Sequence, residues 1–135
     1  MLKVCNGCNL KNAKLDKVDL RGADLRNSNL SGASLIGVDL TSADLSGANL
    51  SGADLSSSIL HKADLSGANL TNISLSFSNL SYANLKNANL TNSNLMNASF
   101  FLAKLYKANL SKAFMGLTNF TGADLRKANF TEAEF

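Results

Sequence analysis

Large apolar side chains recur at every fifth position of the chain from Leu10 to Phe135. Two positions before each of them stands a small residue, most often alanine, and the residue between the two is usually Asp or Asn. The five-residue unit is Ser/Thr, Gly/Asn/Ser, Ala, Asp/Asn, Leu, and residues 46–50 are a clean copy of it. A period of five fits neither the 3.6-residue period of an amphipathic helix nor the two-residue period of a simple strand. The pattern therefore predicts a stack of short repeats.

Each unit divides into a short extended side and a corner. In extended backbone, residues two apart point the same way, so Ala and Leu face inward and the Asp or Asn between them faces outward. The other two residues must then turn the chain. Every glycine except Gly116 falls on the second of these two corner positions, which also takes many asparagines. Glycine and asparagine tolerate the positive φ that the third residue of a type II turn requires, so this position suits them.

The outward residues indicate how many sides close one coil. Asparagine fills one outward column, at every fourth unit and without a break: Asn9, Asn29, Asn49, Asn69, Asn89, Asn109 and Asn129. A column taken at every third unit mixes this class with others. The sequence therefore predicts a four-sided coil of four units without loop insertions, about six and a half coils long and stacked at the strand spacing of about 4.8 Å.

The inward and outward columns have different predicted roles. We expect the large inward residues to form the core, and they include Leu45, Leu50, Leu65, Leu70, Leu85 and Leu90. The asparagine column could be a flat recognition surface, but stacked amides also hydrogen-bond along a ladder. We favour this structural ladder for Asn29, Asn49, Asn69, Asn89 and Asn109.

The run of in-phase units over residues 6–135 resembles the pentapeptide repeat family. The resemblance implies an all-β fold, a right-handed quadrilateral parallel β-helix that forms a single domain over residues 6–135, with residues 1–5 as a short N-terminal cap. In this family the C-terminal ends commonly stack into dimers, often with Phe in place of Leu in the last coils. Phe120, Phe130 and Phe135 are similar to that feature, so a homodimer through the C-terminal coil is one expectation.

Some members of the family mimic duplex DNA, bind type II topoisomerases such as gyrase and confer quinolone resistance. That role calls for a long acidic rod. Here the net charge is +3 and the acidic column Asp24, Asp44 and Asp64 spans few coils. DNA mimicry is therefore the alternative function, ranked second.

The composition and the residue patterns exclude several classes of function and location. The N-terminus has no apolar run typical of a signal peptide, and no stretch approaches the roughly 20 apolar residues of a membrane span. We therefore expect a cytoplasmic protein without a membrane partner. No carboxylate pair, metal-ligand set or nucleophile–base arrangement is evident. The sequence predicts no enzyme activity, no small-molecule substrate, no cofactor and no metal.

Two candidate chemical groups have simpler interpretations. Cys5 and Cys8 form a C-x-x-C pattern, but zinc needs four ligands and the only histidine, His61, is far away along the chain. We favour small core residues over a local disulfide or redox pair. His61 lies on an outward corner without a nucleophile or base beside it, so we expect a solvated side chain.

The more informative signal is apolar residues in outward positions. Ile36 and Ile59 are early examples, but most lie between residues 77 and 117: Phe77, Tyr82, Met96, Phe101, Leu102, Tyr106, Phe114 and Leu117. We expect these eight to form one patch along an edge of the rod. Contiguous apolar patches mark interfaces, so the favoured function is a non-enzymatic module that binds a protein partner or a second copy.

The positive charge is unevenly placed. Residues 65–118 contain Lys86, Lys104, Lys107 and Lys112 and no acidic residue, and Arg126 and Lys127 follow. Such a basic face could meet an anionic partner. It lacks the aromatic interleaving of a nucleic-acid platform, so we favour a solvated surface and expect no nucleic-acid partner.

Overall fold

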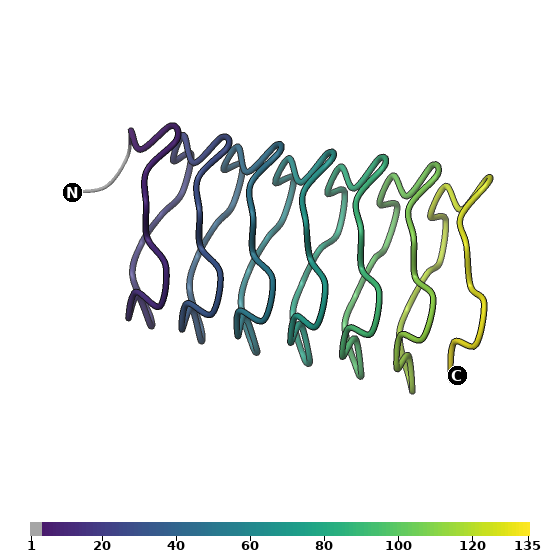
Figure 1. Cartoon of the computed structure of the whole chain (residues 1–135). Helices are drawn as coiled ribbons and strands as arrows, with labels where there is room; N and C mark the ends of the chain where they lie inside the picture. The colour runs from purple at the N-terminus through teal and green to yellow at the C-terminus, as the bar shows by residue number, and fades with distance from the viewer. Residues whose placement is uncertain (1–3) are drawn as a thin grey trace.

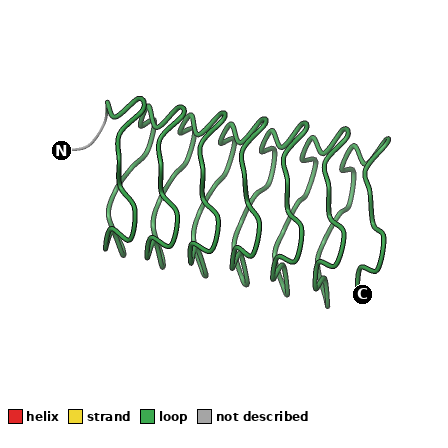
Figure 2. Ribbon diagram, in the orientation of Figure 1, coloured by secondary structure: helices red, strands yellow, loops and turns green. Residues whose placement is uncertain are grey.

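The computed structural model describes residues 4–135 as a rod of stacked coils, with Val4 and Phe135 at opposite ends of the rod (Figure 1). Within these residues there is no helix and no strand longer than a single bridge residue, so the whole trace is drawn as loop and turn (Figure 2). Each five-residue unit contributes one bridge residue and one two-residue turn. No helix of the described part of the chain is long and apolar enough to cross a membrane.

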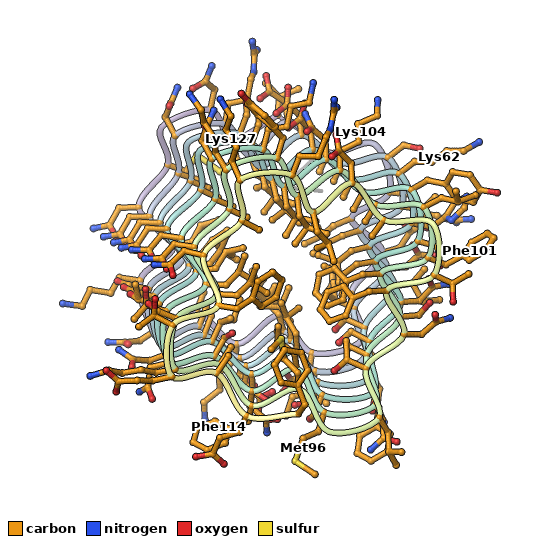
Figure 3. All side chains as sticks on the ribbon, turned by 90° about the vertical axis from the view of Figure 1, so that its right-hand side faces the viewer. Lys62, Met96, Phe101, Lys104, Phe114 and Lys127 are labelled. Carbon is orange, nitrogen blue, oxygen red and sulfur yellow. A yellow bond between two sulfur atoms is a disulfide. The ribbon has the colours of Figure 1, made fainter. Side chains whose placement is uncertain are left out.

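The register of the coils follows from the bridges. Each bridge is parallel and joins residues four units apart, from Val4 with Asp24 to Phe114 with Glu134. One coil therefore takes four units and has four sides, as the view along the rod shows (Figure 3). The bridges continue without interruption, so no loop is inserted between these residues.

Backbone hydrogen bonds hold each unit to both neighbouring coils. In the unit that ends at Leu50, the Leu50 amide donates to Asn69 O at 2.8 Å and the Asn49 amide donates to Ser28 O at 2.9 Å. At the following corner, the Gly52 amide donates to Thr71 O at 2.9 Å. The turn itself is closed by the Ala53 amide, which donates to Leu50 O at 3.0 Å. Because this set recurs from side to side, the backbone of the coils is satisfied without long strands.

The corners confirm the expected backbone conformation. The second corner residue has a positive φ at each corner from Gly7 to Glu132. This includes glycines such as Gly47, at +66°, and asparagines such as Asn72, at +57°. Gly116, which occupies the first corner position, is the one glycine outside this set.

The core is a column of leucines flanked by alanines. Leu45, Leu50, Leu65, Leu70, Leu85 and Leu90 are buried, as are nearly all the inward residues from Leu20 to Met115. Phenylalanine takes over in the last coils, where the Phe100 and Phe120 rings are stacked with centroids 5.1 Å apart. Phe120, Phe130 and Phe135 continue this row through edge and tilted contacts.

Hydroxyl residues in the alanine position need partners inside the core. Ser58 Oγ donates to Leu35 O and Ser78 Oγ donates to Leu55 O, both at 2.8 Å, and Thr118 Oγ1 donates to Leu95 O at 2.7 Å. Ser93 is also buried, but its Oγ has no hydrogen-bond partner. Because an unpaired buried hydroxyl costs free energy, Ser93 is a weak point of the scaffold.

The first corner corrects the expectation for the cysteines. Cys5 and Cys8 form a disulfide, with Cα atoms 5.2 Å apart, rather than serving only as small core residues. Their inward placement brings the sulfurs together, because one stands in the leucine position and the other in the alanine position across the same turn. The Cys5 amide also donates to Asp24 O, so residues 4–5 follow the coil pattern. The rest of the predicted cap, residues 1–3, lies outside the described residues.

Candidate interaction surfaces

The outward residues from Phe77 to Leu117 include bulky side chains on left-handed backbone. Phe77, Tyr82, Leu102 and Leu117 occupy the second corner position with φ between +55° and +62°. For residues other than glycine this conformation costs roughly 1–2 kcal/mol. Every second corner residue from Gly7 to Glu132 has a positive φ, so what distinguishes these four is a large apolar or aromatic side chain in that conformation. They identify candidate surfaces, because strained positions of this kind cluster at functional sites.

The first surface is the Phe77 corner, formed by Phe77, Met96, Phe114 and Leu117. Phe77 is 66% exposed and Leu117 is 86% exposed, and the other two side chains are also exposed. Met96 occupies the first position of the same corner, and Phe114 is the outward residue on the side that precedes it, so the two lie beside each other (Figure 3). Ile36 lies at the same corner but three coils before Met96, so it is separate from this group.

The second surface is the Tyr82 corner, formed by Tyr82, Phe101 and Leu102. The Tyr82 ring meets the Phe101 ring edge to face, with centroids 5.8 Å apart. Tyr82 is 45% exposed, Leu102 is exposed and Phe101 is half-buried. Leu102 also covers Gly122 on the next coil, where a Cβ would lie 2.6 Å from Leu102 Cδ2.

His61 extends the Tyr82 corner by one coil. Its ring meets the Tyr82 ring edge to face, with centroids 5.4 Å apart, so His61, Tyr82 and Phe101 form one aromatic row. The sequence pattern predicted a solvated His61; in the structure its side chain is half-buried and has Tyr82 as an aromatic neighbour. The spacing of these three residues was the available signal, because it is close to the four units of one coil.

The eight predicted interface residues do not form one patch. Phe77 and Tyr82 are one unit apart and therefore lie at successive corners, with the outward polar residues Asn79, Ser99 and Asn119 between the two corners. Figure 3 shows Phe101 well separated from Met96 and Phe114 around the coil. Tyr106 lies at a third corner. The predicted edge is therefore three separate surfaces.

Cations surround Tyr106 at the third corner. Its ring centroid lies 5.5 Å from Lys107 Nζ, 5.8 Å from Lys127 Nζ and 5.9 Å from the Arg126 Cζ atom. Arg126 also forms a bidentate pair with Asp124, with contacts of 2.8 Å to each carboxylate oxygen. These hydrogen bonds lower the pKa of Asp124 to about 2. Tyr106 thus belongs to a basic surface rather than to an apolar one.

The asparagine column has two structural roles. Each of Asn29, Asn49, Asn69, Asn89 and Asn109 accepts a hydrogen bond on Oδ1 from the backbone amide two residues later, at 3.1–3.2 Å. Hydrogen bonds between side chains join only some members of the column. Asn69 Nδ2 donates to Asn49 Oδ1 at 3.3 Å, and Asn109 Nδ2 donates to Thr91 Oγ1 at 3.0 Å. The corner-capping role was missed, although Asn and Asp before a turn are its known signal.

The acidic residues of the first coils are paired with arginines. Arg21 contacts Asp19 at 2.6 Å and Asp39 at 3.8 Å. Arg26 contacts Asp24 at 2.6 Å and Asp44 at 3.8 Å, and the hydrogen bonds from its guanidinium lower the pKa of Asp24. Two arginines therefore neutralise much of the acidic surface of these coils.

The described residues show neither a pocket nor a metal-binding group. No three His, Cys, Asp or Glu side chains of residues 4–135 are placed to hold one metal ion, and no cavity opens between these residues. The chemistry that the described surface offers is apolar, aromatic and ionic contact with a partner.

The family model for pentapeptide repeats matches this sequence over residues 4–41, 33–72, 73–111 and 98–135. No curated protein sequence matches the chain.

Among solved structures, a pentapeptide repeat protein from the Arabidopsis thaliana thylakoid lumen is 30% identical, with a TM-score of 0.68 over 70% of this chain and 67% of that chain. QnrB1, a plasmid-mediated fluoroquinolone resistance protein, is 17% identical, with a TM-score of 0.55 over 97% of this chain and 88% of that chain. At this identity the likeness to QnrB1 shows the fold alone.

Proposed function

The chain belongs to the pentapeptide repeat family, and from this premise we propose that it is a non-enzymatic interaction module that binds a protein through the Phe77 corner. The family implies a right-handed parallel β-helix, in which the coils act as a rigid support for outward side chains. The partner is a second copy of the chain or another protein with a complementary apolar surface.

The observation that carries this proposal is the combination of strain and exposure at the Phe77 corner. Phe77 and Leu117 hold a left-handed backbone that favours Gly or Asn, with φ of +60° and +59°. Their side chains are also the most exposed of the predicted interface residues. Neither feature benefits the isolated rod, whereas burial of a Phe or Leu side chain against a partner contributes about 1.5–3 kcal/mol.

The Tyr82 corner has a weaker claim to the same role. Its rings already contact one another, and Leu102 already covers Gly122. Less of its apolar surface therefore remains for a protein partner. Phe101, Leu102 and Tyr82 are therefore not part of the proposed interface.

Light scattering tests self-association directly. We compare the native chain with Phe77→Ser/Leu117→Ser and with the matched control Ile36→Ser/Ile59→Ser, which removes two exposed apolar side chains elsewhere. If a second copy is the partner, the native chain and the control are dimers or larger and the Phe77/Leu117 variant is a monomer. If the native chain and both variants are monomers, self-association is excluded.

A quantitative capture experiment then tests a different protein partner. The native chain, the Phe77/Leu117 variant and the Ile36/Ile59 control are immobilised and the bound proteins are compared by mass spectrometry. The proposal expects a protein that the native chain and the control retain and that the Phe77/Leu117 variant loses. If all three also remain monomers, identical capture by all three would contradict the proposal.

The charges weigh against DNA mimicry. The acidic column is short, and Asp24 and Asp44 are both contacted by Arg26. A rod that imitates duplex DNA needs an extended unneutralised negative surface. A gyrase supercoiling assay tests this alternative. Inhibition of gyrase by the native chain at stoichiometric concentration would support DNA mimicry.

The cytoplasmic location remains a proposal, and the disulfide provides its test. Disulfides persist mainly in oxidising compartments. In a cytoplasmic location the Cys5–Cys8 disulfide of the structure would be reduced, so protein recovered from cells under alkylating conditions would carry two free thiols. Full oxidation there would instead indicate an oxidising compartment.

A further inference from the structure

One side of the coil carries aromatic and basic residues together. Residues 101–107 cross this side, with Phe101 at one corner, Lys104 in the outward position and Tyr106 with Lys107 at the next corner. Figure 3 shows Phe101, Lys104 and Lys127 following one another around this part of the coil. We call this the mixed face; it consists of Tyr82, Phe101, Lys104, Tyr106, Lys107 and Lys127. It does not include the Phe77 corner.

Within residues 4–135, the lysines of the mixed face form no ion pair with an acidic side chain. The carboxylate that lies among them, Asp124, is the bridge partner of Lys104 and is bound by Arg126. Lys107 and Lys127 stand at the same corner on adjacent coils, and their Nζ atoms lie 5.5 and 5.8 Å from the Tyr106 ring centroid. Such like charges repel one another, and an anion bound between them would relieve the repulsion.

The backbone conformation of the two lysines adds a cost in free energy to the repulsion between their charges. Lys107 and Lys127 have φ of +58° and +61° at corner positions that suit Gly or Asn. Two lysines are therefore held close together on unfavourable backbone, without a counter-charge other than the Asp124 that Arg126 already binds. Lys17, Lys62 and Lys112 have the same backbone conformation, so what distinguishes Lys107 and Lys127 is their common neighbour Tyr106.

The aromatic row supplies apolar ring contacts along the same side, with neighbouring rings nearly perpendicular to one another. Tyr82 and Phe101 lie on adjacent coils, which are about 4.8 Å apart along the rod, and their rings contact each other. Unpaired nucleic-acid bases stack on aromatic side chains irrespective of sequence, while lysines beside them follow the phosphate backbone. An acidic peptide would use the lysines but has no use for a row of rings.

We propose that the mixed face binds single-stranded nucleic acid, with phosphates at Lys104, Lys107 and Lys127 and bases against Tyr82 and Phe101. The sequence pattern predicted no nucleic-acid partner because the basic face was judged to lack interleaved aromatic residues. The structure brings Tyr82 and Phe101, on adjacent coils, to the side of the coil that carries these lysines. Single strands are favoured over duplexes because paired bases cannot reach the rings.

Fluorescence anisotropy with a labelled single-stranded oligo(dT) long enough to cross the whole face tests the proposal. For the three phosphates placed at Lys104, Lys107 and Lys127, we expect affinity to fall about 20-fold between 50 and 200 mM salt. Lys107→Ser/Lys127→Ser should weaken binding by about tenfold or more, since it removes two phosphate contacts. The control Lys14→Ser/Lys17→Ser makes the same change of net charge at the other end of the rod and should have a much smaller effect. Equal losses in the two double variants would overturn the proposal, because only net charge would then matter.

A second pair of variants tests base stacking. Tyr82→Ser should weaken oligo(dT) binding by about tenfold, within the range for loss of one base stack, whereas Phe77→Ser on the Phe77 corner should leave it unchanged. Thermal melts establish that each variant is folded. A duplex of the same length that binds as tightly as the single strand would overturn base contact. Binding to phosphatidylserine vesicles but not to oligo(dT), lost in Lys107→Ser/Lys127→Ser, would assign the face to an anionic membrane instead.

The two proposals fail independently. The light-scattering test depends on Phe77 and Leu117, and the anisotropy test depends on Tyr82, Lys107 and Lys127. A negative result in one test leaves the other proposal standing, because the residues lie at different corners of the coil.

Discussion

The coils between residues 26 and 75 and the coils between residues 77 and 127 share one kind of core but differ at their corners. In the first region the second corner position holds mostly Gly, Asn and Ser; in the second it includes Phe77, Tyr82, Leu102, Lys107 and Leu117. The inward leucines and alanines are mostly buried in both. The comparison shows that corner residues can vary without disturbing the core, because their side chains point away from it.

The largest expected effect comes from breaking the register that both regions share. Deleting residues 46–65 joins Leu45 to Ser66 in the same phase and should leave a shorter folded rod. Deleting only residues 56–58 shifts all later residues by three positions, so that polar residues enter the core and the second region unfolds. Circular dichroism during thermal denaturation would compare the two deletions. Equal thermal stability would contradict the four-sided coil.

A smaller effect tests whether the two cores are equivalent. Leu70→Ala in the first region and Leu90→Ala in the second both remove a buried leucine from equivalent positions. Each should lower the free energy of unfolding by about 2–5 kcal/mol through lost burial and cavity formation. Urea denaturation measures both values. A near-zero effect in only one region would show that the two cores are not equivalent.

The next prediction, with a smaller expected effect, tests the backbone strain at the corners. Leu117→Asn should raise the free energy of unfolding by about 1 kcal/mol, because asparagine adopts the left-handed conformation more readily. The reverse change, Gly67→Leu, should lower it by roughly 1–2 kcal/mol, since a Cβ at Gly67 meets no other atom within 4 Å and only backbone strain acts. Asn87→Gly serves as the control with little expected change, because both residues accept the left-handed conformation. A lower stability of Leu117→Asn would mean that the corner is not strained.

The smallest effect concerns a buried hydroxyl group in the second region. Ser93→Ala should raise the free energy of unfolding by about 1 kcal/mol, because Ser93 Oγ is buried without a partner. Ser78→Ala is the matched control and should lower it by about 1 kcal/mol, because Ser78 Oγ donates to Leu55 O. Urea denaturation of both variants should therefore give changes in the free energy of unfolding that have opposite signs. Two destabilised variants would show that Ser93 has a partner in solution.

Much of the candidate site could be listed from the sequence but not assembled from it. Phe77, Leu117 and the other outward apolar residues were identified by their departure from the unit. Their division between corners was missed, because residues one unit apart look adjacent along the chain but lie at successive corners. The aromatic row of His61, Tyr82 and Phe101 was missed for the complementary reason, since its members lie far apart along the chain, on successive coils.

Local groups show the same limit. The spacing of Cys5 and Cys8 allowed both a core role and a disulfide, and only the direction of their side chains across one turn decided between them. The pairing of Arg26 with Asp24 is local, but its contact with Asp44 joins adjacent coils.

The sequence by itself determined which side chains face inward, where the corners fall and how many units complete a coil. These features follow from backbone geometry within each unit and from the period of the outward asparagines, so they can be inferred one unit at a time. The tertiary structure decided which outward residues become neighbours: the rings at the Tyr82 corner, the cations around Tyr106 and the exposed side chains of the Phe77 corner. Those contacts depend on side-chain directions at residues on neighbouring coils, and the order of residues along the chain does not contain that information directly.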